Sequence, residues 1–347
     1  MNYAKITLFL LFSVFFTCGF TQTTPDKTAP AKATPAKAAP AKTTPAKATP
    51  AKTTKGPQKA PAKKQAATSP DLKEMNLFSK DNFYNKPVAP PRTMTEQDTK
   101  ARDLFVSGSK KGQAADYHGA IADFTKSIEL SPNAGTYVRR GWAYQMLSNY
   151  DAAIADAGEA LKLRPMLGLA NFIRGVSYYQ KGNYKDAKAD LDIFLEKDRT
   201  NVIAFNIRAA LAYMEQDYKT ALVNYDMVVK LDPKFTDIYT NRGMMRHILQ
   251  DYKGALEDCN EAIKLDPNNA TAYNNRGGAY AMLKDYKSSL ADFDKAISID
   301  GKYADAYNSR GRVKQVMGDQ EGACADWQVA YANGLEATRE LIIKYCK

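Results

Sequence analysis

Small, aromatic and apolar residues recur with a fixed period along about two-thirds of the chain, from Ala101 to residue 334. Seven units of the same pattern follow one another at spacings of 33 or 34 residues. They begin at Ala101, Ala134, Gly168, Val202, Thr236, Ala270 and Ala304. A period of this length is typical of arrays of helical pairs, because a single pair cannot bury its apolar face without a neighbour. The pattern therefore predicts seven stacked pairs of helices.

Positions in the unit are counted as places from its first residue. Place eight is glycine in six units and alanine in one, and place twenty is alanine in six units and serine in one. Because these side chains are small, we expect the two helices of a unit to approach closely there. Place seventeen is tyrosine in six units, at Tyr117, Tyr150, Tyr184, Tyr218, Tyr252 and Tyr286. Four units end near a proline, which fixes the turn to the next unit.

This order of Gly, Tyr, Ala and Pro, with its 34-residue period, resembles the tetratricopeptide repeat (TPR) family. The resemblance implies an all-α fold, a right-handed TPR solenoid of seven helix-turn-helix repeats over residues 101–334. We expect Gly334 to end the last repeat and residues 335–347 to form a capping helix, with Leu341, Ile342 and Tyr345 facing inward. In the family, the first helix of each repeat lines a concave groove that binds a protein or an extended peptide.

Place seven departs from the family pattern, which usually has an apolar residue there. Six units carry an arginine, at Arg140, Arg174, Arg208, Arg242, Arg276 and Arg310, and the other carries Ser107. Place twenty-three reads Asp123, Asp156, Asp190, Asn224, Asp258, Asp292 and Asp326. We expect Arg–carboxylate pairs within or between units, because the planar guanidinium matches a carboxylate with two hydrogen bonds. An anion-binding strip of arginines is the alternative.

The amino end has the pattern of a signal peptide, with a short basic start and an apolar run from Ile6 to Phe20. We expect cleavage near residue 21, and therefore export to the periplasm or cell envelope. A lipid anchor on Cys18 and an uncleaved anchor are the alternatives. The resemblance also extends to exported TPR proteins of Bacteroidetes-like bacteria.

Residues 22–70 form a predicted disordered linker rich in Lys, Ala and Pro. Prolines recur every five residues from Pro25 to Pro50, and the segment lacks large apolar side chains, so nothing offsets the entropy of ordering it. Contact of its lysines with an envelope polymer is one interpretation, and a solvated spacer is the other. Residues 71–100 are expected to form an irregular arm lying partly on the first helices, and Thr93 with Glu96 fits a capping box that opens the first long helix.

Charge and composition narrow the classes of function. The net charge of +11 resides almost entirely before residue 71, so the repeats are nearly neutral and no nucleic-acid partner is expected. Two histidines and four cysteines leave little material for a metal site. No catalytic or phosphate-loop motif occurs, so we predict neither an enzyme nor a cofactor. The oligomeric state stays open.

The resemblance implies a partner groove along places two, five, nine and twelve of the first helices, which share one side of a helix. This stripe is apolar in repeats two to four and polar in repeats four to seven. The candidate residues are Val138, Trp142, Phe172, Tyr179, Asn206, Tyr213, Met244, His247, Asn274, Asn308 and Arg312, with Asn241 and Asn275 beside them. An Asn amide can donate to and accept from a peptide backbone. The alternative is that the apolar half packs helix on helix and the Asn residues are solvated.

The cysteines allow one disulfide. Cys259 stands at a core place and is expected to be an inert thiol. Cys324 and Cys346 flank the capping helix, and an exported chain permits a bridge between them. The sequence thus indicates a non-catalytic envelope scaffold that binds a protein or peptide in its groove. The alternative is a spacer that binds peptidoglycan or lipopolysaccharide through its cationic linker.

Overall fold

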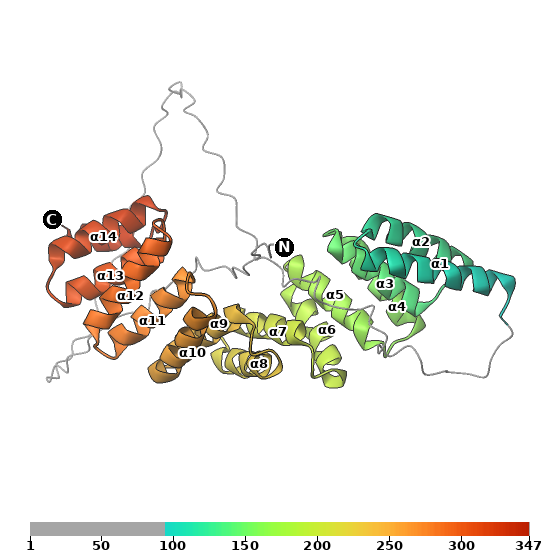
Figure 1. Ribbon diagram of the computed structural model, residues 1–347, viewed down its shortest axis with the longest axis horizontal. Coiled ribbons are helices and arrows are strands. Elements are labelled where there is room, and N and C mark those ends of the chain that lie inside the picture. The colour runs from blue at the N-terminus through green and yellow to red at the C-terminus, as the bar shows by residue number, and fades with distance from the viewer. Residues whose placement is uncertain (1–93, 347) are drawn as a thin grey trace, which may run out of the picture. The chain divides into compact units, whose positions relative to one another are not determined.

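The computed structural model describes residues 94–346. The predicted signal peptide, the linker and most of the predicted arm lie outside the described residues. Within this range the chain forms fifteen helices and no strand (Figure 1). The helices are α1 (Glu96–Gln113), α2 (Tyr117–Leu130), α3 (Ala134–Met146), α4 (Tyr150–Leu163), α5 (Gly168–Gln180), α6 (Tyr184–Lys197), α7 (Val202–Met214), α8 (Tyr218–Leu231), α9 (Thr236–Ile248), α10 (Tyr252–Leu265), α11 (Ala270–Met282), α12 (Tyr286–Ile299), α13 (Ala304–Val316), α14 (Gln320–Ala332) and α15 (Thr338–Tyr345).

Each repeat is one pair of helices, with α1 and α2 as the first pair and α13 and α14 as the seventh. From α3 onward every first helix begins at the first residue of its unit, and every second helix begins at place seventeen. The turn between the two helices has a positive φ at place fifteen, which is glycine in two repeats and a residue such as Lys284 (φ 65°) in the other five. The residue at place sixteen then caps the second helix. In the sixth repeat, for example, the Asp285 side chain accepts a hydrogen bond from the Ser288 amide at 3.1 Å.

The first helix starts earlier than the repeat pattern indicates. A capping box joins Thr95 and Asp98, each side chain accepting a hydrogen bond from the other's backbone amide at 3.1 Å. The predicted box of Thr93 and Glu96 is wrong by two residues, because an aspartate at the third helical position serves as well as a glutamate. Residues 96–100 therefore belong to α1 and not to the arm.

Close contact between paired helices explains the glycines at place eight. A Cβ at Gly277 would lie 2.8 Å from the Phe293 ring and 3.1 Å from the Ser289 carbonyl oxygen of the facing helix α12. Gly311 stands in the same relation to Trp327 in the last repeat. The small residues thus let α11 lie directly on α12, and the aromatic ring at place twenty-four fills the space beside them.

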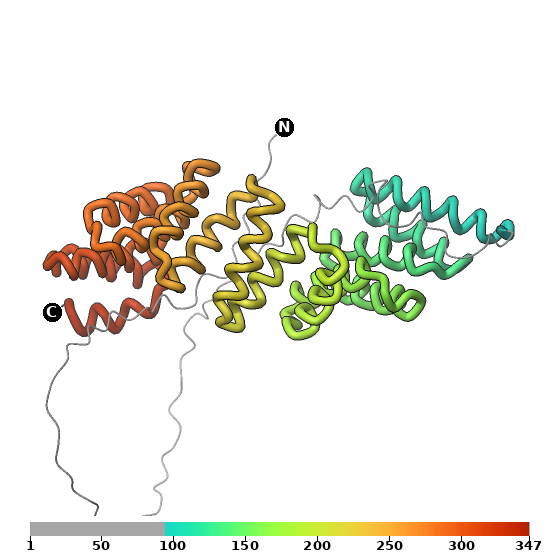
Figure 2. The backbone as a smooth tube through the Cα atoms, turned by 90° about the horizontal axis from the view of Figure 1, so that it is seen from below, coloured from blue at the N-terminus to red at the C-terminus, as the bar shows by residue number. Residues whose placement is uncertain are grey.

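The pairs stack in chain order (Figures 1 and 2). First helices contact the first helices of neighbouring repeats, as α3 does with α5, α9 with α11 and α11 with α13. One hydrophobic cluster runs continuously from α3 to α7. We call the side of the first helices that carries places two, five, nine and twelve the first-helix face.

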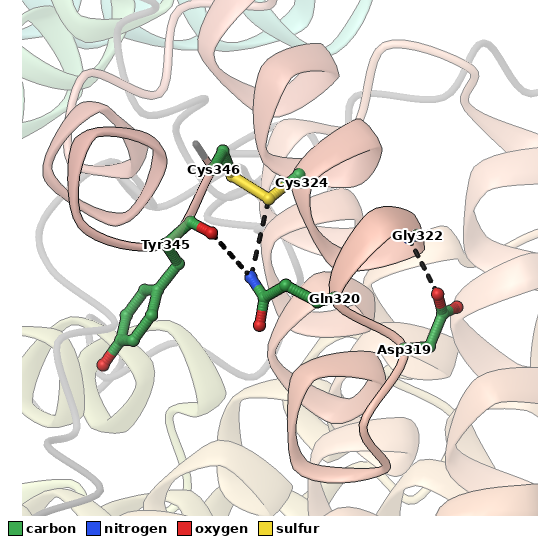
Figure 3. Close-up of a disulfide and its surroundings, with 6 residues drawn as sticks. All are labelled: Asp319, Gln320, Gly322, Cys324, Tyr345 and Cys346. Atoms are coloured by element: carbon green, nitrogen blue, oxygen red, sulfur yellow. Dashed lines mark hydrogen bonds between the residues drawn. A yellow bond between two sulfur atoms is a disulfide. The ribbon is translucent and has the colours of Figure 1, made fainter.

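The last helix is attached to the array by a disulfide. Cys324 of α14 and Cys346, just after α15, are bonded (Figure 3). Beside this bond, the Gln320 side-chain amide donates to the Tyr345 carbonyl oxygen at 3.1 Å, and the Tyr345 ring lies 5.9 Å from the Trp327 ring. Helix α15 is shorter than predicted, but it covers the end of the last pair.

Candidate functional site

Arginines and aspartates join the two helices of most repeats. In five repeats the place-seven Nε and Nη2 donate to the carboxylate at place twenty-three of the same repeat, at 2.6–3.1 Å. The pairs are Arg140–Asp156, Arg174–Asp190, Arg242–Asp258, Arg276–Asp292 and Arg310–Asp326. In the first repeat, Lys111 takes over the role of the missing arginine and lies 2.7 Å from Asp123.

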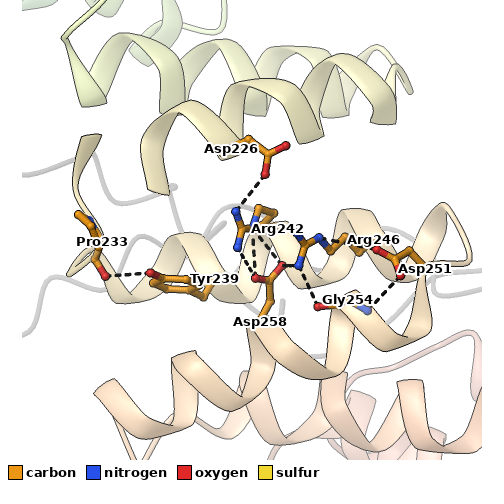
Figure 4. A network of polar contacts seen from close by, with 8 residues as sticks. All are labelled: Asp226, Pro233, Tyr239, Arg242, Arg246, Asp251, Gly254 and Asp258. Carbon is orange, nitrogen blue, oxygen red and sulfur yellow. Dashed lines mark hydrogen bonds and ion pairs between the residues drawn. The ribbon is translucent and has the colours of Figure 1, made fainter. Parts of the chain in front are cut away.

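The same arginines also reach the preceding repeat. Arg242 Nη1 donates to Asp226 at 2.9 Å, so one guanidinium joins α8, α9 and α10 (Figure 4). Arg276 and Arg310 make equivalent bonds to Asn260 and Asp294 at place twenty-five, at 2.7 and 2.5 Å. The guanidiniums are therefore occupied on both sides, which favours the predicted structural pairing over an anion-binding strip.

Tyrosines at place four cover these guanidiniums. In four repeats, the guanidinium carbon (Cζ) of the arginine lies 5.3–5.6 Å from the ring centre of the tyrosine three residues earlier. The Tyr239 hydroxyl also donates to the Pro233 carbonyl oxygen at 3.0 Å, which fixes the turn that precedes its repeat. An arginine is tolerated at this usually apolar place because carboxylates accept hydrogen bonds from its N–H groups and the tyrosine ring covers the face of its guanidinium.

The fourth repeat interrupts this series. Place twenty-three is Asn224, whose side-chain amide donates to the Thr220 carbonyl oxygen at 2.7 Å instead. Arg208 keeps an ion pair with Asp192 of the third repeat, but its Nε and Nη1 are buried and lack a hydrogen-bond partner in the described chain. The neighbouring junction of α6 with α7 is also the least extensive contact between successive repeats.

The apolar candidates for the partner groove lie in the core. Val138, Trp142 and Phe172 are at most 4% exposed and belong to the hydrophobic cluster of α3 to α7. The Phe172 ring lies 4.9 Å from Phe194 of its own second helix, and the Trp142 ring meets Tyr117 edge-on at 5.6 Å. Of the two interpretations of this half of the stripe, the structure favours the packing of helix on helix.

Three aromatic candidates at place twelve form a row along the array. Each ring contacts the place-seventeen tyrosine of its own repeat: Tyr179 with Tyr184, Tyr213 with Tyr218 and His247 with Tyr252, at 5.8, 5.9 and 5.2 Å between ring centres. Burial raises the pKa of Tyr179 and Tyr213, and it lowers the pKa of His247 to about 4. These side chains are therefore uncharged at neutral pH.

The asparagine candidates include buried polar atoms without partners. The Asn206 Oδ1, the Asn241 Nδ2 and the Asn274 Oδ1 are each inaccessible to solvent and make no hydrogen bond in the described chain. They stand in three successive repeats, the fourth to the sixth, at places five and six. An unsatisfied buried polar atom costs about 1–3 kcal/mol, and native structures rarely hold several in register.

The remaining candidates lie on the same face. Met244 is buried, and Asn275 accepts a long contact of 3.5 Å from the Asn274 amide. The Arg312 Nε lies 3.4 Å from the Asn308 Oδ1 one turn earlier in α13. Tyr303, which is not among the candidates predicted from the sequence, reaches Thr271 and Asn274 of α11 from the turn before α13. A residue in an irregular turn has no fixed place in the helical period.

Two features, a metal-binding cluster and a membrane-spanning helix, are absent from the described residues. No group of three His, Cys, Asp or Glu side chains within residues 94–346 could hold a metal ion. Among the same residues, no helix is both long enough and apolar enough to cross a membrane. Cys259 is a buried free thiol, and burial raises its pKa to about 12, so it stays protonated.

Several known proteins are similar to this chain. Tetratricopeptide repeat models match residues 138–187, 174–235 and 270–303, and a TPR repeat model matches residues 243–284. Small glutamine-rich tetratricopeptide repeat-containing protein 2 of Saccharomyces cerevisiae is 34% identical over 104 residues, which are 28% of this chain and 30% of that protein. The protein of the same name from Mycosarcoma maydis is 40% identical over 76 residues, 22% of either chain. The chain thus matches less than a third of the length of these relatives.

A solved structure agrees with the sequence comparison. The crystal structure of YrrB, described as a TPR protein with an unusual peptide-binding site, superposes with a TM-score of 0.51 and 26% identity. The match covers 53% of this chain and 95% of YrrB. The matched repeats, the seven helical pairs and the 34-residue period together show that residues 101–334 have the fold of a tetratricopeptide repeat solenoid.

Proposed function

We propose that the chain is a non-catalytic scaffold that binds an extended polypeptide along the first-helix face of its fourth to seventh repeats. The observation that carries this proposal is the set of unpartnered amide atoms at Asn206, Asn241 and Asn274. An acceptor, a donor and an acceptor follow one another along three successive first helices. A polypeptide backbone supplies the matching donor, acceptor and donor wherever the donating residues are not proline.

Spacing supports the same proposal. Packed helices lie ~8–10 Å apart, so neighbouring first helices present their amides at about that interval. An extended backbone advances ~3.3 Å per residue and therefore offers a peptide group to each helix every third residue. The aromatic row of Tyr179, Tyr213 and His247 flanks this path, and its uncharged rings suit the apolar side chains of a ligand.

The cellular setting is a proposal as well. The signal-peptide pattern of residues 1–21 supports export, and we place the scaffold in the periplasm or cell envelope of a bacterium on that ground. TPR proteins in general mediate protein–protein interactions, and YrrB is described as having a peptide-binding site. Binding of an envelope polymer by the cationic linker is the alternative, and it concerns residues outside the described range.

A photocrosslinking experiment in intact cells tests the proposal. The variant Asn275→p-benzoylphenylalanine places the reactive group beside the first-helix face of the sixth repeat, and Lys287→p-benzoylphenylalanine places it on the exposed side of α12 in the same repeat. We expect a discrete protein adduct from position 275 and none from position 287. With the captured segment as a purified peptide, Asn241→Ala should weaken binding about fivefold to tenfold, the value of one hydrogen bond. Equal adducts from both positions, or unchanged affinity, would contradict the proposal.

A further inference from the structure

Helix α15 continues the register of the repeats. It begins at Thr338, which follows the first residue of the seventh unit, Ala304, by the 34-residue period of the array. Thr338 is buried, as Ala101 and Ala134 are at place one of their units. Helix α15 contacts α14, just as α13 contacts the second helix that precedes it, α12. It therefore occupies the position of the first helix of an eighth unit and extends the row of first helices.

The Tyr345 side chain joins α15 to the first-helix face of the seventh repeat. Its ring lies 5.9 Å from the Trp327 ring of α14. The Lys344 ammonium, the Gln315 amide and the Arg312 guanidinium all lower the pKa of its hydroxyl, so these groups lie close to it. Arg312 and Gln315 stand at places nine and twelve of α13, which belong to the first-helix face. The phenol therefore lies at the edge of that face.

The aromatic row at place twelve ends in the fifth repeat. In the sixth and seventh repeats this place carries Ala281 and Gln315. Because the Tyr345 phenol lies beside Gln315, it brings an aromatic ring back to the face at the seventh repeat. The neighbouring Arg312 Nε lies 3.4 Å from the Asn308 Oδ1, one turn earlier on the same face. The position of α15 therefore helps to decide what a polypeptide contacts on this repeat.

The disulfide keeps α15 in this position. Cys346 directly follows Tyr345 and is bonded to Cys324 of α14, and the Gln320 side-chain amide donates to the Tyr345 carbonyl oxygen at 3.1 Å (Figure 3). The helix has only eight residues, and isolated helices shorter than ~12–15 residues are marginally stable. Both bonded cysteines are half-buried, so a small reductant can reach them, whereas Cys259 is fully buried.

We propose that the Cys324–Cys346 bond regulates polypeptide binding by the first-helix face. In the oxidised protein, α15 holds Tyr345 against the polypeptide on the seventh repeat, and reduction releases α15 and weakens binding. This inference rests on the proposed function, because it concerns regulation of the same face. A dithiol is the reductant: it gives two electrons and two protons to the two sulfur atoms, which become thiols, and is itself oxidised to a disulfide.

The size of the effect follows from the loop that the bond closes. The two cysteines are 22 residues apart, and a bond across such a loop favours the docked state of α15 by roughly a hundredfold. Without it, the short helix detaches for much of the time. The polypeptide then loses its contact with the Tyr345 ring, and we expect binding about fivefold weaker, the value of one aromatic contact.

Photocrosslinking from α15 in intact cells tests whether the binding face extends to this helix. Tyr345→p-benzoylphenylalanine places the reactive group at the edge of the first-helix face. Ile343→p-benzoylphenylalanine is the matched control, because Ile343 is 68% exposed and stands two residues away, on the opposite side of the helix. We expect position 345 to capture the same protein as position 275, and position 343 to capture none.

The captured segment, as a purified peptide, tests the regulation. It should bind the oxidised full-length protein about fivefold more tightly than the protein reduced with dithiothreitol. Because coupling is reciprocal, saturating peptide should make the bond harder to reduce by the same factor, at a fixed ratio of reduced to oxidised dithiothreitol. Tyr345→Ala should weaken binding to the oxidised protein by a similar factor. A Cys324→Ala, Cys346→Ala double variant should bind like the reduced protein, with or without dithiothreitol.

Two results would overturn the inference. One is equal affinity of the peptide for the oxidised and the reduced protein. The other is that position 345 captures no more than position 343, which would show that the polypeptide does not reach α15. If position 275 captures a protein in either case, the proposed function stands while this regulation is wrong. If neither position 275 nor position 345 captures a protein, both fail.

Discussion

Replacing Asn224 by aspartate should stabilise the array, because it restores the one missing carboxylate opposite a place-seven arginine. In the wild type, Arg208 holds Asp192 with one side of its guanidinium, and its Nε and Nη1 are buried without a partner in the described chain. Repeat five shows the arrangement that the variant would create, since Arg242 bonds carboxylates on both sides at 2.6–3.1 Å.

The expected gain follows from opposing contributions. Two new charge-assisted hydrogen bonds stabilise by about 1.5–3 kcal/mol each. Loss of the Asn224–Thr220 bond costs about 0.5–1.5 kcal/mol. Burying the new carboxylate costs several kcal/mol more. The guanidinium is buried and charged already, so its desolvation is not a new cost. These contributions nearly cancel, and the net stabilisation that remains is about 1 kcal/mol.

Urea unfolding and hydrogen exchange measure this gain. Because repeat arrays do not always unfold in one step, exchange read by mass spectrometry should locate the effect in α7 and α8, with amide opening there about tenfold rarer. The matched control is Asn260→Asp, since Asn260 already accepts a bond from Arg276 at 2.7 Å and should change stability by less than ~0.5 kcal/mol. If Asn224→Asp leaves the free energy of unfolding unchanged or lowers it, the unpartnered Nε and Nη1 of Arg208 do not destabilise the wild type, and the reasoning is wrong.

Three further predictions concern packing, the cap and pH. Gly277→Ala should destabilise by about 1–3 kcal/mol, because its Cβ would stand 2.8 Å from the facing aromatic ring, as urea unfolding would report. Reducing the Cys324–Cys346 bond, which closes a separation of 22 residues, should destabilise the last repeat by about 3 kcal/mol and raise exchange in α14 and α15. Burial lowers the pKa of His247 to about 4, against about 6.5 in the unfolded chain. The contribution of the neutral imidazole to the free energy of unfolding is therefore complete above pH 6.5 and is lost as the pH falls toward 4. His247→Gln should therefore flatten the dependence of stability on pH in that window by about 2–3 kcal/mol.

Each of these has an internal control. Gly278→Ala meets no atom closer than 3.6 Å and should be neutral or stabilise by up to ~1 kcal/mol, so an equal loss at both glycines would refute the contact. A Cys324→Ala, Cys346→Ala double variant should respond to no reductant, and a response would show that another group is responsible. Unchanged pH dependence in the histidine variant would show that this side chain does not titrate between the two states.

The helices themselves could be predicted closely from the sequence. The first residue of each first helix from α3 on, and place seventeen for each second helix, follow from a period that stacking keeps constant. The start of the array is different, because Thr95 caps α1 ahead of the first unit, where no period applies. The pairing of Arg242 with Asp258 also followed from the two regular places, whereas its second bond to Asp226 depends on how repeats stack and needed the structure.

The candidate site was harder to predict. Phe172 and Asn206 both stand at place five, yet the first packs on Phe194 and the second keeps an unpartnered oxygen. Helical periodicity puts such residues on one side but cannot tell which of them the neighbouring helix covers. Tyr303 lies in a turn, and its closeness to Asn274 arises from the stacking of α13 on α11, which no single repeat encodes.

Hydrogen exchange of the full-length protein with and without a captured polypeptide tests the central claim most directly. Binding along the first-helix face predicts added protection in α7, α9, α11 and α13 and at most slight changes in α8, α10 and α12. Protection confined to the second helices, or spread evenly over the array, would contradict the account, because the ligand would then lie on a surface that lacks the unpartnered amides.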